Sequence, residues 1–184
     1  GRVFRLKTYE IPSTGLSAKG VAIANLLQLH PEEEITSIIT HRNDDKEGFM
    51  FMCTTHGVVK KTSVEAYKNV RSSGLIAINL DDGDELKWVR FSNGDNEIVV
   101  STQLGQAIRF HESEVRSMGR VSRGVRGIRL RKDDIVVGMV IVEDDANIFV
   151  ISENGYGKRT KVKQFTAHKR GGVGIRSAVV NAKT

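Results

Sequence analysis

Basic side chains recur at one fixed place in this sequence. Each stands four residues after a glycine, at Arg5, Lys61, Arg109 and Arg159. The guanidinium fork of arginine matches phosphate oxygens, and a nearby glycine lets the backbone approach a phosphate closely. We therefore expect these cations to bind a phosphate-rich polyanion. The alternative is that they are outward strand positions that are simply solvated.

Further cations accompany this pattern. Lys60 and Lys158 stand three residues after their glycines, and Lys19, Arg123 and Arg170 each precede the glycine of a second motif. The predicted contact set is Arg5, Lys19, Lys60, Lys61, Arg71, Arg109, Arg116, Arg120, Arg123, Arg126, Lys158, Arg159, Lys169 and Arg170.

The charges are segregated along the chain. The 184 residues include 28 basic and 22 acidic side chains, for a formal net charge of +6. Residues 115–132 and 154–184 together carry 15 basic residues and no acidic one. Segregation of this kind predicts a surface that faces a polyanion, with nucleic acid the leading candidate. The alternative is a pair of basic loops without a partner.

The sequence gives little support to catalysis. Its five histidines do not pair at metal-ligand spacings, and no nucleophile-elbow, phosphate-loop or dinucleotide fingerprint is present. Cys53 lies in an apolar segment, which favours a buried thiol. Acidic clusters at 32–34 and 81–84 are interpreted as polar loops turned away from the basic rim. We predict no catalytic residue and no metal site.

Internal repeats predict the elements that would position these cations. Three motifs recur in constant order: an acidic cluster with an apolar strand, two short strands joined at a glycine, and a glycine followed by a short strand. Each unit is about 50 residues long and holds four strand signals bounded by turn residues. The pattern indicates an all-β, propeller-like disc of four-stranded blades. A plain β-sandwich is the alternative.

The repeats predict one domain over residues 1–184. It comprises a partial blade at 1–27 and blades at about 28–80, 81–130 and 131–184. A polar insert at 43–47 is expected to form a hairpin loop. Because Gly1 falls inside a unit, we expect an excerpt from a larger polypeptide. A single cysteine and the lack of a long apolar run predict a reducing, cytoplasmic setting away from membranes.

Several segments resemble one family, the C-terminal domains of bacterial DNA gyrase A. The segments are 5–12, 74–80, 107–110, 124–130 and 153–160. The resemblance implies a β-pinwheel, a disc whose blades exchange strands, here present as a partial set. It further implies that a basic rim bends and wraps duplex DNA without reading its sequence, in support of negative supercoiling.

The resemblance also sets expectations for partners and cofactors. The domain would be the non-catalytic, DNA-binding part of an ATP-dependent type II topoisomerase near the nucleoid. Its partners would be duplex DNA, the rest of gyrase A, and gyrase B. It would need no cofactor of its own, since ATP and Mg²⁺ act elsewhere in the holoenzyme.

The chain departs from the family pattern at one motif. The family carries a Gln-Arg-Arg-Gly-Gly-Lys-Gly type box, and the nearest match is 168–174, with His for Gln and Val for the second cation. We expect the true box to lie before Gly1. The alternatives are the equivalent domain of topoisomerase IV and a β-propeller adaptor that binds acidic protein segments.

Overall fold

Apolar segments on either side of Gly57, Gly105 and Gly155 fold into three antiparallel hairpins. They are β2 (Phe49–Thr54) with β3 (Val58–Ser63), β6 (Glu97–Thr102) with β7 (Gln106–His111), and β10 (Asn147–Ile151) with β11 (Gly157–Lys161). Each of the three glycines has a φ between +77° and +83°, a backbone conformation that side chains rarely adopt. The hairpins predicted from the repeats are therefore present.

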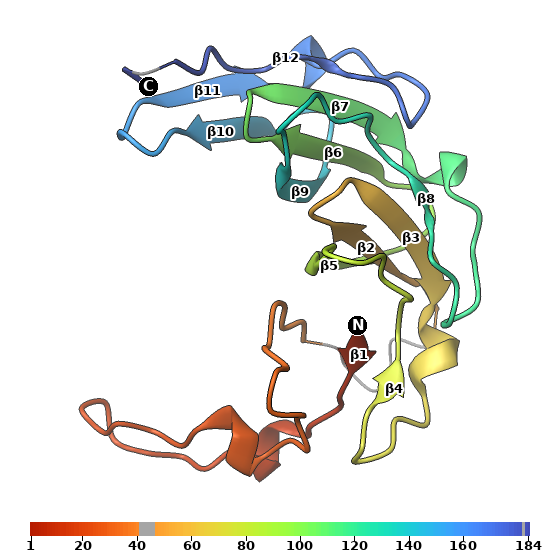
Figure 1. Ribbon diagram of the computed structural model, residues 1–184, viewed down its shortest axis with the longest axis vertical. Helices are drawn as coiled ribbons and strands as arrows, with labels where there is room; N and C mark the ends of the chain where they lie inside the picture. The colour runs from red at the N-terminus through yellow and green to blue at the C-terminus, as the bar shows by residue number, and fades with distance from the viewer. Residues whose placement is uncertain (41–46, 182) are drawn as a thin grey trace.

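Each complete sheet combines one hairpin with two strands from later in the chain. In this computed structural model, which describes residues 1–40, 47–181 and 183–184, two sheets have four strands (Figure 1). One has the order β5-β2-β3-β8, with β5 (Leu86–Ser92) and β8 (Val125–Arg126) outermost. The other has the order β12-β7-β6-β9, with β9 (Val136–Val142) and β12 (Ile175–Arg176) outermost.

Successive units interlock through these outer strands. A third short pairing joins β1 (Arg2–Val3) to β4 (Leu75–Ile76). Likewise, β8 pairs with β3 and β12 pairs with β7, the second hairpin strand of the preceding unit in each case. The strands of one sheet thus come from two successive sequence units. The predicted blade boundaries at about 80 and 130 therefore do not coincide with the sheets, because each four-stranded sheet contains strands from both sides of a boundary.

Short 3₁₀ turns complete the structure. They are η1 (Thr8–Glu10), η2 (Ile23–Asn25), η3 (Val64–Tyr67), η4 (Glu112–Glu114) and η5 (Val162–Gln164). The described residues form strands, 3₁₀ turns and loops without an α-helix, which confirms the all-β prediction. None of their helical segments could cross a membrane. Apart from Glu47, the polar insert lies outside the described residues.

The main core lies between the two four-stranded sheets. Phe51 and Phe110 are fully buried with ring centroids 6.4 Å apart, and Ile98 packs in the same cluster. Cys53 is also buried there, and burial raises the pKa of its thiol. This burial agrees with the interpretation of Cys53 as a structural thiol.

Two acidic residues have a role that the sequence did not suggest. Asp84 is 7% exposed, and its Oδ1 accepts hydrogen bonds from the His56 amide at 2.8 Å and the Thr55 hydroxyl at 2.9 Å. Asp134 is 6% exposed and accepts from the Leu104 amide at 2.9 Å. Each aspartate therefore caps the hairpin turn of the preceding unit. Within the acidic cluster at 81–84, the sequence analysis did not anticipate this capping role of Asp84.

The units follow one another around an arc. Figure 1 shows a C-shaped molecule whose sheets succeed one another along the arc, with the loops before β4, β8 and β12 on its outer, convex edge. The same repeat that sets the strands thus sets a series of equivalent loops along one edge.

Candidate nucleic-acid interface

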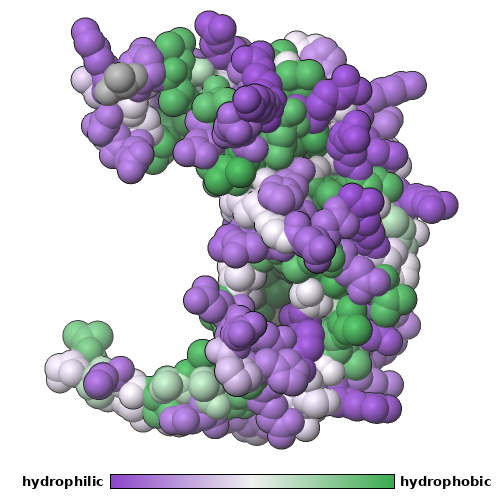
Figure 2. Space-filling view, viewed as in Figure 1, coloured by the Kyte–Doolittle hydropathy of each residue, from purple (hydrophilic) through white to green (hydrophobic). Residues whose placement is uncertain are grey.

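The convex edge is formed by three equivalent loops. We call residues 64–74, 112–124 and 162–174 the rim loops; each connects a hairpin to the next short strand, which is β4, β8 or β12. Figure 2 shows hydrophilic side chains projecting along this edge. The basic runs found in the sequence supply two of the three loops.

Backbone hydrogen bonds join neighbouring rim segments. The Asn79 amide donates to the carbonyl of Ser122 at 3.3 Å, and the Arg129 amide donates to the carbonyl of Gly172 at 2.8 Å. These two bonds occupy equivalent places in successive units, each five residues after the glycine that precedes the short strand. The second and third rim loops are therefore each bonded to the segment that follows the short strand of the preceding unit.

Two arginines at equivalent positions add side-chain hydrogen bonds between neighbouring units. Arg120 Nη1 donates to the carbonyl of Ile76 at 3.5 Å, and Arg170 Nη1 donates to the carbonyl of Arg126 at 3.0 Å. Arg170 Nε also donates to the carbonyl of Glu114 at 2.8 Å. Both arginines are half-buried. Among the described residues the hydrogen-bond partners of both side chains are carbonyls, so no carboxylate there neutralises their positive charge.

This geometry corrects one alignment of the repeats. The glycine equivalent to Gly124 is Gly174, since β8 and β12 begin one residue after them. A Cβ on Gly174 would lie 2.3 Å from the carbonyl oxygen of Ala107, so only glycine fits. Arg170 is therefore the counterpart of Arg120, and the sequence alignment of Arg170 with Arg123 is wrong.

Most of the predicted contact residues are exposed. Arg123 forms an ion pair with Asp81, and Lys158 Nζ donates to the carbonyl of Ser177 at 3.0 Å. The exposed members of the set are Arg5, Lys19, Arg71, Arg116, Arg123, Arg126, Lys158, Arg159 and Lys169. Of these, Arg71, Arg116, Arg123 and Lys169 lie in the rim loops, and Arg126 is the second residue of β8.

Lys60 does not face solvent. It is fully buried, and its Nζ donates to the carbonyl of Ala77 at 2.6 Å and to the carbonyl of Arg120. Burial, together with the charge of Arg120, lowers the pKa of Lys60 to about 8. The prediction of Lys60 as a surface contact is therefore corrected: it ties β3 to two loops.

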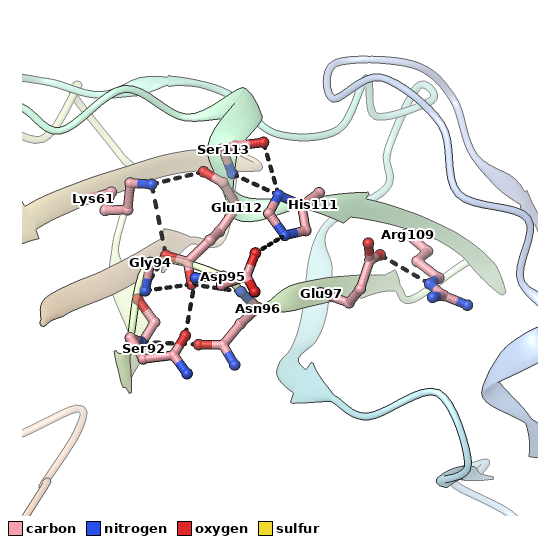
Figure 3. Close-up of polar contacts among 11 residues, drawn as sticks. Lys61, Ser92, Gly94, Asp95, Asn96, Glu97, Arg109, His111, Glu112 and Ser113 are labelled. Atoms are coloured by element: carbon pink, nitrogen blue, oxygen red, sulfur yellow. Dashed lines mark hydrogen bonds and ion pairs between the residues drawn. The ribbon is translucent and has the colours of Figure 1, made fainter.

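Lys61 is buried on the opposite face of β3. Its side chain is 8% exposed; Nζ donates to the carbonyl of Glu112 at 2.9 Å and lies 3.7 Å from the Glu112 carboxylate (Figure 3). It also lies 5.0 Å from the centre of the Phe49 ring. Both faces of β3 are covered: the face of Val59 and Lys61 packs against the next unit across the main core, and the face of Lys60 packs against the cluster that contains Ala77. Lys61 is therefore also corrected from a phosphate contact to a buried residue.

Arg109 occupies the equivalent place on β7 and is likewise enclosed. Its side chain is 11% exposed, Nε donates to Glu97 at 2.9 Å, and Nη2 pairs with Asp144. Nη1 donates to the carbonyl of Val162 at 3.3 Å. Two carboxylates already neutralise its charge, which corrects the expectation that it binds phosphate.

Sequence reasoning missed exposed cations. Arg176 on β12 is the counterpart of Arg126 on β8, and both are exposed. Arg129, Arg131 and Lys132 are also exposed and end one of the basic runs. The motif alignment centred on Gly174 identifies Arg176 directly.

A serine, a histidine and an aspartate lie in line near the rim. His111 Nδ1 lies 2.7 Å from Ser113 Oγ, and His111 Nε2 lies 3.2 Å from Asp95 Oδ1 (Figure 3). His111 also accepts from the Ser113 amide as the N-cap of η4. The Asp95 side chain is 92% exposed, far from the desolvated setting that activates a catalytic serine. We assign the group to capping.

Known proteins match the whole chain. The family model described as "DNA gyrase C-terminal domain, beta-propeller" matches residues 1–42, 49–93, 96–143 and 146–183. The DNA gyrase A protein of Clostridium acetobutylicum is 50% identical over 184 residues, which is 100% of this chain and 22% of that protein. The Salmonella typhimurium protein of the same name is 39% identical over 183 residues, 100% of this chain and 21% of that protein. The chain thus spans about a fifth of these relatives' length.

Solved structures show the same architecture. The DNA gyrase A C-terminal domain superposes with a TM-score of 0.83 at 26% identity, covering 100% of this chain and 59% of that one. The C-terminal domain of DNA topoisomerase IV superposes with a TM-score of 0.83 at 32% identity, covering 91% of this chain and 53% of that one. The predicted β-pinwheel fold is confirmed.

Proposed function

The chain belongs to the family of DNA gyrase A C-terminal domains, and from this premise we propose that its rim loops bind and bend duplex DNA without reading the sequence. Within gyrase this binding would support negative supercoiling. The domain would act as a non-catalytic part beside the rest of gyrase A and beside gyrase B, in the bacterial cytoplasm at the nucleoid. DNA binding by the domain itself would need neither ATP nor Mg²⁺.

One observation carries the proposal: exposed cations are arranged in equivalent loops along a convex edge. Arg116 and Arg123 come from one rim loop and Lys169 from the next, and the Arg170 side chain joins the two loops by donating to the carbonyl of Glu114 at 2.8 Å. Phosphates recur along a duplex at regular intervals, so a regular array of cations on an arc suits a bent duplex. Contacts of this kind go to the phosphate backbone and carry no sequence information.

Bending makes cooperation between loops necessary. Smooth bending of a short duplex costs on the order of 1–6 kcal/mol, more than a single exposed ion pair supplies. The carbonyl-bound Arg120 and Arg170 add positive potential beneath the exposed side chains, because carbonyls leave their charge in place. We therefore expect affinity to arise from several rim loops acting together.

The proposal is tested by a fluorescence-anisotropy titration with duplexes of unrelated sequence over a salt series. The variant Arg123→Glu/Arg126→Glu should bind every duplex more weakly and show a shallower slope of log K against log salt. The matched control Lys87→Glu/Arg90→Glu changes the same charge on β5, outside the rim loops, and should retain most of the affinity. Equal losses of DNA affinity in both variants would show that binding responds to the net charge of the protein alone.

The titration also addresses the alternatives. A wild-type protein that binds no duplex at low salt would favour the adaptor for acidic protein segments. The topoisomerase IV domain shares the fold, but the family model and the 50% identical relative favour gyrase.

A further inference from the structure

We propose that Lys61 and Arg109 are positioning residues, each of which fixes the rim loop of the next unit so that its exposed cations face DNA. The inference rests on the proposed function for its DNA part. The sequence pattern suggests that these two side chains contact phosphate. Their geometry indicates that they act through the loops instead.

Lys61 holds both ends of one short segment. Its Nζ donates to the carbonyl of Glu112 at 2.9 Å, and its own carbonyl accepts from the Met118 amide at 2.8 Å. The Glu112 carbonyl also accepts from the Val115 amide, which closes η4. Arg116, an exposed cation of this rim loop, lies between the two attachment points. Figure 3 shows the Lys61 side chain reaching across to Glu112.

Arg109 makes the same attachment one unit later. Its Nη1 donates to the carbonyl of Val162 at 3.3 Å, and its own carbonyl accepts from the His168 amide at 2.8 Å. The Val162 carbonyl accepts from the Phe165 amide, as Glu112 accepts from Val115. Lys169 follows immediately after the held segment. Two units therefore share one arrangement at equivalent residues.

Neither side chain is available to a phosphate. The Lys61 side chain is 8% exposed beside the fully buried Glu112 carboxylate, and the Arg109 side chain is 11% exposed between two carboxylates. Reaching DNA would break these bonds and, at Lys61, leave a buried carboxylate without its cation, which is costly. Their effect on binding must therefore pass through the loops that they hold.

Hydrogen exchange of the free protein tests the attachment without any DNA. In Lys61→Met, exchange of the Val115 and Met118 amides should become about tenfold faster or more, since a charge-assisted hydrogen bond is lost. The Phe165 and His168 amides should keep their rates. Arg109→Met should give the reverse pattern, so each variant is the control for the other.

Two exchange results would overturn the proposal. One is unchanged rates in both held segments; the other is a uniform increase across the whole chain in both variants. If Lys61→Met does not fold because Glu112 loses its partner, Arg109→Met still decides, since Asp144 is 67% exposed.

A double-mutant cycle tests the link to DNA. If Lys61 acts through its loop, Arg116→Ala should reduce DNA affinity by a smaller factor in the Lys61→Met background than in the wild type. If the two substitutions instead reduce DNA affinity by independent factors that multiply in the double variant, Lys61 does not act through Arg116. Lys87→Met serves as the control for losing one positive charge. A wild type that binds no DNA would contradict the proposed function, whereas the exchange result would still stand.

Discussion

At the scale of single residues, the buried carboxylate of Glu112 links the rim to a neighbouring turn. It is fully buried and accepts from the Ser92 hydroxyl at 2.8 Å and from the Gly94 and Asn96 amides at 3.0 and 2.9 Å. Its two carboxylate oxygens thus accept hydrogen bonds from the end of β5 and from the turn between β5 and β6, while its backbone carbonyl accepts a hydrogen bond from Lys61. One residue therefore joins three segments.

We expect Glu112→Gln to destabilise the protein by about 2–4 kcal/mol. The amide offers only one oxygen, and its NH₂ group would face the ammonium group of Lys61, which cannot accept a hydrogen bond. Urea unfolding measures the loss, and Glu114→Gln in the same turn, where the residue is exposed, should change stability by less than about 0.5 kcal/mol. Equal effects of the two substitutions would contradict this account.

Lys60 predicts a pH dependence of stability. Its pKa lies at about 8 in the folded protein against an ordinary value of 10.5. Between these values the unfolded chain binds more protons, so stability rises with pH in this window, by at most about 3 kcal/mol. Urea unfolding from about pH 7 to about pH 10 should show the wild type gaining stability relative to Lys60→Met. A constant difference would mean that the two carbonyl partners offset the burial of the charge.

At the scale of elements, the interlocking of the units depends on a close backbone approach at the start of each short strand. Gly174 has φ +76° and lies against the Ala107 carbonyl, where β12 pairs with β7. Gly155 has φ +83° but nothing within 4 Å of its missing Cβ. At both positions the positive φ would strain any residue with a side chain, but only at Gly174 would a Cβ also collide with neighbouring atoms.

Gly174→Ala should therefore cost clearly more stability than Gly155→Ala. Strain at positive φ costs roughly 1–2 kcal/mol at each site, and only Gly174→Ala must also move β12 from β7. Exchange of the Ser177 amide, which donates to the Gly105 carbonyl at 2.8 Å, should quicken in Gly174→Ala alone. Similar costs and similar exchange would show that β12 tolerates a shift.

At the scale of the whole molecule, the arc of rim loops predicts a dependence on duplex length. A duplex of about 40 base pairs that bends can reach more rim loops than one of about 12, and each phosphate engaged steepens the salt slope by about 0.9. The longer duplex should also bring dyes on its two ends closer together when bound, as measured by energy transfer. Identical slopes on both lengths would indicate one local patch and no bending.

The sequence alone indicated the repeated hairpins, the all-β class and the segregation of charge. These features are local: a glycine at positive φ sets each hairpin turn, a short apolar segment bounded by turn residues sets each hairpin strand, and acidic residues are absent from two stretches. The resemblance to the gyrase family rested on the same local segments.

The sequence could not show which cations face solvent. Lys61, Arg109 and Arg159 hold the same place in their repeats, yet two are enclosed and Arg159 is exposed. The difference arises because the next unit covers β3 and β7, whereas β11 pairs only with β10 among the described residues. The same holds for Asp84 and Asp134, whose partners lie about 30 residues away.

The strands, the hairpin turns and the basic character of two rim loops are thus readable from the sequence, because each depends on neighbours along the chain. Which basic residues bind backbone carbonyls and which stay exposed follows from the tertiary packing alone. That choice depends on how one unit packs against the next, and a periodic pattern, being the same in every unit, carries no record of it.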